Sequence, residues 1–188
     1  MRDALIVSTA RTPIAKSYRG TFNNTTAPTM AGWAIEQAVI RSGADPKDVD
    51  DVIMGAALQQ GTTHGNIARN SALAAGLPVT VSGMSIDRQC SSGMMAIGTA
   101  AKQIIIDGMD IVVGGGLDSI SLVQTDKMNL HKYVDKNLVS KHKHIYMPML
   151  QTAEVVAKRY NISREDQDQY SLQSQLRTAK AQNEGKFN

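Results

Sequence analysis

The stretch from residue 84 to residue 106 contains the only cysteine of the chain, Cys90, between two apolar segments of different period. Residues 79–86 alternate apolar and small side chains as a strand does, whereas the apolar residues from 94 to 105 recur with helical spacing. The turn is therefore predicted within residues 88–93. At the amino end of a helix, free N–H groups and the helix dipole favour the thiolate, which is the nucleophilic form of cysteine.

The neighbours of Cys90 leave two interpretations open. Ser91 or Ser92 can cap the predicted helix, and Arg88 can add positive charge, although it can equally pair with Asp87. The alternative to a nucleophile is a cysteine that only packs in the core, because free cysteines are among the most buried residues. Spacing alone does not decide between them.

Composition narrows the class of protein. The chain has 188 residues, enough to bury a core, and a net charge of +3 that favours anionic ligands only weakly and gives no indication of nucleic-acid binding. A single cysteine excludes an intrachain disulfide and a cysteine-based zinc cluster. No apolar run is long enough to span a membrane, and the N-terminal residues are typical of a strand rather than a signal peptide. These features predict a cytoplasmic protein.

The elements expected around the cysteine alternate between strand and helix, which predicts an α/β layered fold. Strands are expected at residues 4–9, 51–55, 79–86 and 110–114, and helices at residues 29–41, 66–75, 94–106, 152–160 and 164–183. Gly43 and Gly108 are predicted helix stops.

Two further patterns were weighed as ligand sites. The run Gly114-Gly115-Gly116 lacks the spacing of a dinucleotide-binding loop, so that interpretation is rejected. His131, His142 and His144 lie among lysines, whose ammonium groups repel a metal cation. A solvated loop is favoured there, with contact to the phosphates of a ligand as the second option.

Residues 87–97, DRQCSSGMMAI, resemble the nucleophile segment of thiolases, the enzymes that make or cleave 3-oxoacyl-CoA. The resemblance continues along almost the whole chain. ALIVSTARTPIAK at 4–16, DVIMGAALQQGTTHGNIAR at 51–69, DIVVGGGLDSIS at 110–121 and the segment 148–175 are similar to further thiolase motifs, in the family's order. Several motifs in one order are far more specific than a Cys-Ser-Ser-Gly tetrapeptide.

The resemblance implies a thiolase-like layered fold, a mixed β-sheet covered by helices. Residues 1–118 are then the N-terminal α/β domain with the nucleophile, and residues 119–188 the first part of the loop domain that covers CoA. The family's Gly-His-Pro, Asn-Glu-Ala-Phe and second-cysteine motifs do not occur, so we expect the C-terminal domain to be absent from this chain. Without those residues, turnover by this chain alone is expected to be lost or very low, and a C-terminal half to restore it.

The chemistry implied by the resemblance centres on an acyl-thioester of Cys90. Its thiolate takes the acyl group of a 3-oxoacyl-CoA, CoA then removes it, and synthesis from acetyl-CoA reverses these steps. The Cys90 backbone N–H contributes to oxyanion stabilisation, and Met149 lines the CoA pocket. Pro148, where many biosynthetic members carry His, is more similar to the degradative branch. Coenzyme A and acetyl-CoA are substrates, with no permanently bound cofactor and no metal.

The resemblance implies a homodimer or tetramer, with residues 59–75 near the subunit interface, and a role in fatty acid metabolism. Neither nucleic acid nor membrane is expected as a partner. One alternative is a non-catalytic thiolase remnant that acts in assembly. Another is a condensing enzyme that uses a carrier protein, although the Arg-Gln-Cys-Ser-Ser-Gly sequence favours a thiolase.

Overall fold

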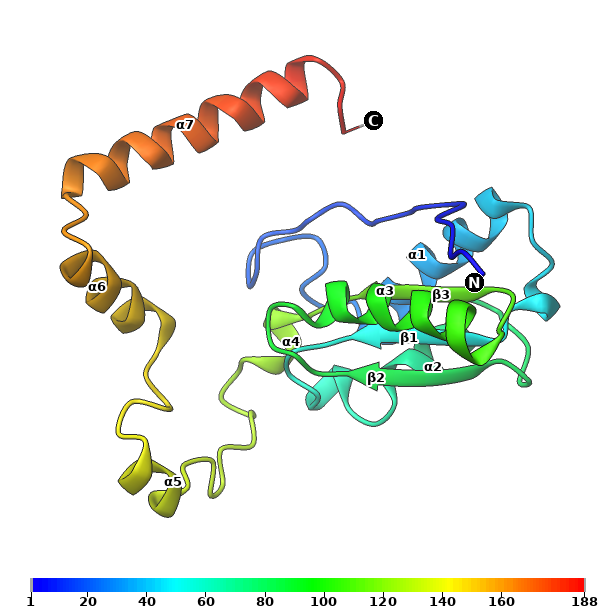
Figure 1. Ribbon diagram of the computed structural model, residues 1–188, viewed down its shortest axis with the longest axis horizontal. Helices are drawn as coiled ribbons and strands as arrows, with labels where there is room; N and C mark the ends of the chain where they lie inside the picture. The colour runs from blue at the N-terminus through cyan, green and yellow to red at the C-terminus, as the bar shows by residue number, and fades with distance from the viewer. Residues whose placement is uncertain (1, 188) are drawn as a thin grey trace. The chain divides into compact units, whose positions relative to one another are not determined.

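The computed structural model describes residues 2–187, in two compact units that are treated separately. The first unit extends to Leu130 and contains a β-sheet, and the second begins at His131 and is helical (Figure 1). The predicted domain boundary between residues 118 and 119 stays a prediction.

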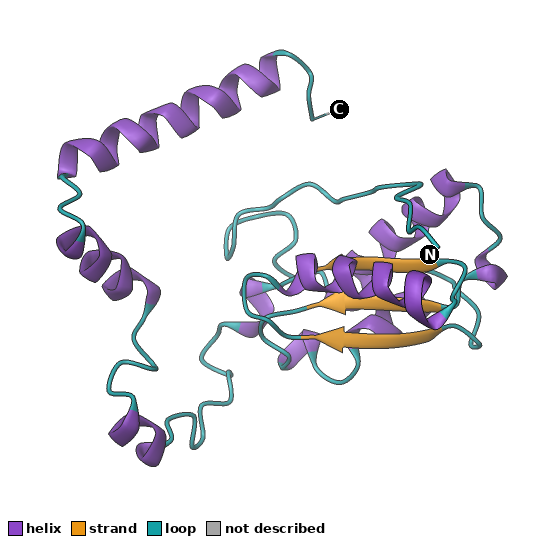
Figure 2. Cartoon of the chain, viewed as in Figure 1, coloured by secondary structure: helices purple, strands orange, loops and turns teal. Residues whose placement is uncertain are grey.

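A three-stranded parallel sheet forms the centre of the first unit (Figure 2). The strands β1 (Asp51–Gly55), β2 (Ser82–Ile86) and β3 (Val112–Gly116) lie in the order β2-β1-β3, with Ile53 opposite Met84 and Gly114. Every residue of the central strand β1 is buried. Because the strands are parallel, their carboxyl ends meet at one edge of the sheet, and the segments that follow them lie close together.

Helices cover both faces of this sheet. The helical elements of the first unit are α1 (Ala27–Ser42), α2 (Ile67–Ala74), α3 (Ser92–Lys102), a π-helical continuation (Gln103–Asp107), α4 (Ile120–Val123) and 3-10 turns at Pro46–Asp48 and Gly61–Thr63. Val52 and Met54 of β1 pack in the cluster formed with α1 and α2, whereas Ile53 points to the other face and packs against α3. The predicted α/β layered fold is therefore confirmed.

The second unit consists of three helices, α5 (Lys136–Lys141), α6 (Met149–Arg159) and α7 (Arg164–Asn183). A capping box begins α7: the Ser163 hydroxyl accepts from the Asp166 N–H at 3.0 Å, and the Asp166 carboxylate accepts from the Ser163 N–H at 3.1 Å. None of these helices has a buried residue. The two predicted C-terminal helices are confirmed, α6 beginning three residues early.

Hydrogen bonds explain where element boundaries differ from those predicted. The strand expected from residue 79 begins at Ser82, because the Val81 N–H closes a turn onto the Pro78 carbonyl at 3.1 Å. Helix α1 begins two residues early, since Pro28 is well tolerated in a first helical turn. Gly108 ends its helix in the left-handed conformation, φ 78°, as predicted.

The prediction of a strand at residues 4–9 is wrong for this structure. The segment has no regular secondary structure, and Leu5, Ile6 and Val7 are 74–79% exposed. Its apolar composition is typical of a strand, but a strand needs a hydrogen-bonded neighbour, which composition cannot supply. The Arg41 guanidinium donates a hydrogen bond of 3.2 Å to the Thr9 carbonyl at the end of this segment.

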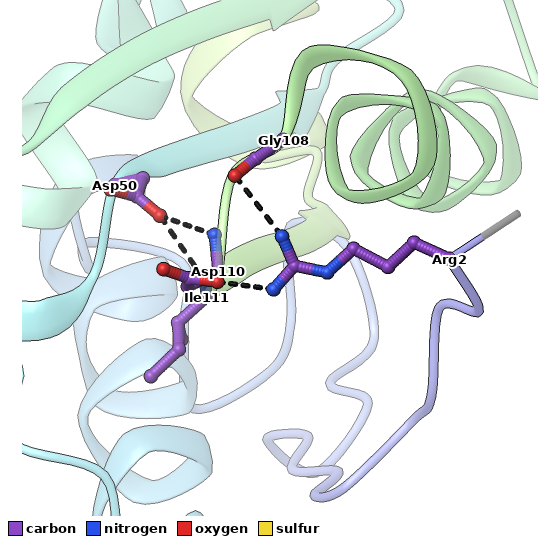
Figure 3. A network of polar contacts seen from close by, with 5 residues as sticks. All are labelled: Arg2, Asp50, Gly108, Asp110 and Ile111. Atoms are coloured by element: carbon purple, nitrogen blue, oxygen red, sulfur yellow. Dashed lines mark hydrogen bonds and ion pairs between the residues drawn. The ribbon is translucent and has the colours of Figure 1, made fainter.

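A polar network joins the amino ends of β1 and β3 (Figure 3). The Asp50 carboxylate accepts from the Asp110 and Ile111 N–H groups, at 2.7 and 3.2 Å. Arg2 donates to the Gly108 carbonyl at 3.1 Å and pairs with the Asp110 carboxylate. These two N–H groups are thus held by a side chain rather than by a strand. This explains why β3 begins two residues later than predicted.

We expect Asp50→Ala to lower the free energy of unfolding by about 1–2 kcal/mol, because two backbone donors lose a charged acceptor and can recover only water. Chemical denaturation measures the change. Asp48→Ala is the matched control: it removes a nearby exposed carboxylate and should change stability by less than about 0.5 kcal/mol. Equal losses in the two variants would contradict the role of this network.

Candidate active site

Cys90 lies in the turn between β2 and α3, at the carboxyl edge of the sheet. Gln89, directly before it, has φ 49°, a left-handed conformation that non-glycine residues seldom adopt. The Asp87 carboxylate accepts from the Gln89 N–H at 2.8 Å and so closes the first part of the turn. The strand, turn and helix predicted around Cys90 are confirmed.

The two serines after Cys90 have different roles. Ser91 takes the N-cap position of α3, but its side chain makes no capping hydrogen bond. Ser92, the first residue of the helix, is buried, and its hydroxyl accepts from the Arg88 N–H at 2.8 Å and donates to the Gln89 carbonyl at 2.6 Å. The expectation that one of them caps the helix through its side chain is thus not met, because the Ser92 hydroxyl is directed back into the turn.

Glycines allow the turn to lie against the strand ends. A Cβ at Gly55, the last residue of β1, would lie 2.2 Å from the Ser92 carbonyl carbon and 2.5 Å from the Gly93 nitrogen. One at Gly116, the last residue of β3, would lie 2.9 Å from the Gly93 Cα. Sequence reasoning missed the role of Gly55. Its signal is a glycine at the end of a strand that precedes the nucleophile segment.

The Cys90 side chain is exposed, so the interpretation of a core cysteine that only packs is wrong. Its backbone N–H lies directly before the N-cap residue of α3, and Cys90 forms an isolated β-bridge with Arg88. Within residues 2–187, Arg88 and Asp87 form no ion pair. The arrangement can present an exposed thiol to a carbonyl group at the amino end of α3.

A cavity of about 340 Å³ lies beside the carboxyl end of β3, and Cys90 does not line it. Residues 10–17 form one wall, residues 116–121 another, and Met30 and Ala34 of α1 close it. It is thus a feature separate from the turn of residues 87–92, which contains Cys90.

Asp118 lies at the rim of this cavity and accepts a hydrogen bond from the Ala57 N–H at 3.2 Å. Partial burial raises the pKa of the Asp118 carboxyl above its usual range, and the negative charge of Asp87 acts in the same direction. The backbone N–H groups of Ala57 and Leu58 oppose this rise in pKa. The folded protein therefore holds the Asp118 proton more tightly than the unfolded chain does.

We expect Asp118→Asn to raise the melting temperature at pH 7, because it removes a carboxylate whose ionisation opposes folding. Ionisation of Asp118 costs no stability below about pH 3.8, the pKa of this carboxyl in the unfolded chain. The loss of stability grows as the pH rises from there through the higher pKa of the folded protein, and it is constant at pH values above that folded pKa. The gap in melting temperature between variant and wild type should narrow as the pH falls from 7 towards 4. A gap independent of pH would contradict the raised pKa.

Met149 lies at the amino end of α6, in the second unit, and is 76% exposed. Pro148 occupies the N-cap position before it, with an extended backbone. Cys90 belongs to the first unit. The role of Met149 in a CoA pocket stays a prediction.

Residues 2–187 contain no group of three or more His, Cys, Asp or Glu side chains placed to hold a metal ion. The histidines at 131, 142 and 144 lie in or beside turns next to the short helix α5. Every helix within residues 2–187 is too short or too polar to cross a membrane.

Residues 4–188 match the family described as thiolase, N-terminal domain. The chain belongs to the thiolase family. It is 37% identical over 187 residues to a 3-ketoacyl-CoA thiolase of Bacillus subtilis, covering 100% of this chain and 47% of that relative. Acetyl-CoA acetyltransferase of Cupriavidus necator is 38% identical over 197 residues, which cover 100% of this chain and 50% of the relative.

The fold of this thiolase chain is also found in solved structures. The crystal structure of the Bacillus anthracis acetyl-CoA acetyltransferase superposes with a TM-score of 0.84 at 36% identity, covering 98% of this chain and 49% of that one. The chain thus spans about half the length of the relatives that it matches.

Proposed function

We propose that this chain is the nucleophile-bearing half of a thiolase, and that Cys90 carries the acyl group between two molecules of CoA. One observation carries the proposal. An exposed Cys90 lies at the amino end of α3 in a chain that belongs to the thiolase family. A thiol in this place can reach a carbonyl group from solvent, and the N–H can stabilise the oxyanion that forms.

In thiolysis the Cys90 thiolate attacks the 3-oxo carbonyl carbon of a 3-oxoacyl-CoA and forms a carbon–sulfur bond. The oxyanion collapses, the bond between C2 and C3 breaks, and its electron pair leaves on C2 as the enolate of acetyl-CoA, which takes up a proton. The shortened acyl group remains on Cys90. The thiol of a second CoA gives up its proton, attacks the thioester and releases acyl-CoA and the Cys90 thiolate. Condensation of two acetyl-CoA molecules is the reverse reaction.

The proton transfers need groups beyond those around Cys90. No histidine lies in residues 84–106, and the chain has no second cysteine. We therefore propose that a C-terminal thiolase half supplies the acid and base groups. The exposed apolar side chains of Leu5, Ile6 and Val7 support such a partner, since apolar residues that adjoin one another at 74–79% exposure are typical of a surface that another polypeptide covers.

Other properties of the whole enzyme are proposals from its relatives. We expect acyl-CoA substrates, a CoA site that includes Met149, a homodimer or tetramer, and a place in fatty acid metabolism in the cytoplasm. The names of the relatives include both 3-ketoacyl-CoA thiolase and acetyl-CoA acetyltransferase, so both reaction directions are consistent with the family.

The test is intact mass spectrometry of the purified protein, with any chains that accompany it, after incubation with acetoacetyl-CoA. We expect one acetyl adduct, on the peptide that contains Cys90. Addition of free CoA should remove the adduct and release acetyl-CoA. A folded protein that stays unmodified with acetoacetyl-CoA, also after a thiolase C-terminal half is added, would overturn the proposal. That result would favour a non-catalytic role in assembly.

A further inference from the structure

Ser92 is the one buried side chain of the nucleophile turn. It is 4% exposed, whereas all residues from Asp87 to Ser91 are exposed. A buried hydroxyl is costly unless it is hydrogen-bonded, and here it is bonded in both directions. The Ser92 hydroxyl accepts a hydrogen bond from the Arg88 N–H at 2.8 Å and donates one to the Gln89 carbonyl at 2.6 Å.

These two bonds span the residues immediately before Cys90. The Ser92 N–H adds a third contact, to the same Gln89 carbonyl at 3.0 Å. The peptide unit before Arg88 and the peptide unit after Gln89 are thus tied to the first residue of α3, and Cys90 lies within the closed ring. The orientation of the Cys90 backbone depends on this ring rather than on any contact of its own exposed side chain.

The backbone at Gln89 needs such support. Its φ of 49° is unfavourable for a residue with a Cβ, and a backbone of this kind persists only when neighbouring contacts hold it. The Asp87 carboxylate supplies one contact at 2.8 Å, but it is exposed to solvent, which competes for it. The buried Ser92 hydroxyl is shielded from that competition.

We propose that Ser92 is a positioning residue for the thiolase reaction: its buried hydroxyl holds Gln89 in the left-handed conformation and so fixes Cys90 at the amino end of α3. The role in catalysis rests on the proposed function of Cys90. The role in fixing the turn rests on the geometry alone. Ser92 acts through Cys90 and does not contact substrate.

The test uses the single cysteine of the chain, whose modification is unambiguous. Two rates are measured: alkylation of Cys90 by iodoacetamide, and acetylation by saturating acetoacetyl-CoA. In Ser92→Ala the acetylation rate should fall about tenfold or more, because a small displacement of a reacting group has a large kinetic effect. The concentration of acetoacetyl-CoA that gives half the maximal rate should stay the same. Ser91→Ala, whose hydroxyl makes no capping bond, is the matched control and should react like wild type.

A second variant distinguishes a role of Ser92 in positioning the turn from a role in stabilising α3. Glycine adopts the left-handed conformation without penalty, so Gln89→Gly should relieve the need for the Ser92 hydroxyl. The double variant Gln89→Gly with Ser92→Ala should regain a large part of the acetylation rate lost in Ser92→Ala. If the Ser92 hydroxyl only stabilised the helix, Gln89→Gly would not restore the acetylation rate of Ser92→Ala.

The outcomes are distinguishable. If wild type is alkylated but never acetylated, also after a thiolase C-terminal half is added, and Ser92→Ala changes alkylation while Ser91→Ala does not, the proposed function fails and the positioning role holds. If wild type is acetylated and Ser92→Ala reacts at the wild-type rate, the inference is wrong. A slow single variant that Gln89→Gly fails to rescue would also overturn it, provided that denaturation midpoints show all variants to be folded.

Discussion

Cys90→Ser should abolish the acetyl adduct formed from acetoacetyl-CoA. A serine hydroxyl is not ionised at neutral pH, and the acyl group would have to form an ester rather than a thioester. Because the Cys90 side chain is exposed, the substitution removes no packing contact from the core. We therefore expect a complete loss of adduct with an unchanged free energy of unfolding, measured by intact mass and by chemical denaturation.

Two controls make this result specific. Ser91→Ala changes the neighbouring residue and should keep the adduct, since the Ser91 side chain makes no capping bond. Digestion of the wild-type adduct should place the acetyl group on the peptide that contains Cys90. An adduct that persists in Cys90→Ser would show that another side chain is acylated, and would contradict Cys90 as the nucleophile.

Gly55→Ala should have the largest effect on the fold of the turn that contains Cys90. Its Cβ would lie 2.2 Å from the carbonyl carbon and 2.4 Å from the carbonyl oxygen of Ser92, and both atoms are backbone that cannot rotate away. Either β1 or the start of α3 must move. Overpacking of this kind costs about 1–3 kcal/mol and sometimes more, and we expect at least about 3 kcal/mol here because no flexible side chain can yield.

Gly98→Ala is the matched control, because it adds the same methyl group within α3 where no atom lies within 4 Å. Alanine is the better helix former, so this variant should gain about 0.5–1 kcal/mol. Denaturation midpoints and the alkylation rate of Cys90 are measured for both. A Gly55→Ala protein as stable as wild type would contradict the close approach of α3 to β1.

Local residue patterns were sufficient to predict the secondary structure around Cys90. The change from alternating to helical spacing around Cys90 predicted the strand, the turn and α3, because each period reflects which side chains must face a core. Gly108 predicted the end of its helix, since it adopts the left-handed conformation readily. The cap at Ser163 and Asp166 likewise involves residues only three apart.

Contacts between residues far apart in the sequence could not be predicted from local residue patterns. The shift of β3 to residue 112 depends on the Asp50 carboxylate, which binds N–H groups sixty residues further along the chain. The apolar segment at residues 4–9 has the composition of a strand and lacks a paired neighbour, and pairing is a property of the whole sheet.

By itself, the sequence determined that Cys90 lies at the start of a helix in an α/β layered chain, and its motifs pointed to the thiolase family. Those features depend on residue type and spacing over a few turns of the backbone. Only the tertiary structure decided that Cys90 is exposed, that the Ser92 hydroxyl is directed back to Arg88 and Gln89, and that Gly55 lets α3 approach β1. The exposure of Cys90 and the approach of α3 to β1 depend on how the helix packs against the strand ends, and that packing is set by the assembled core rather than by any local pattern.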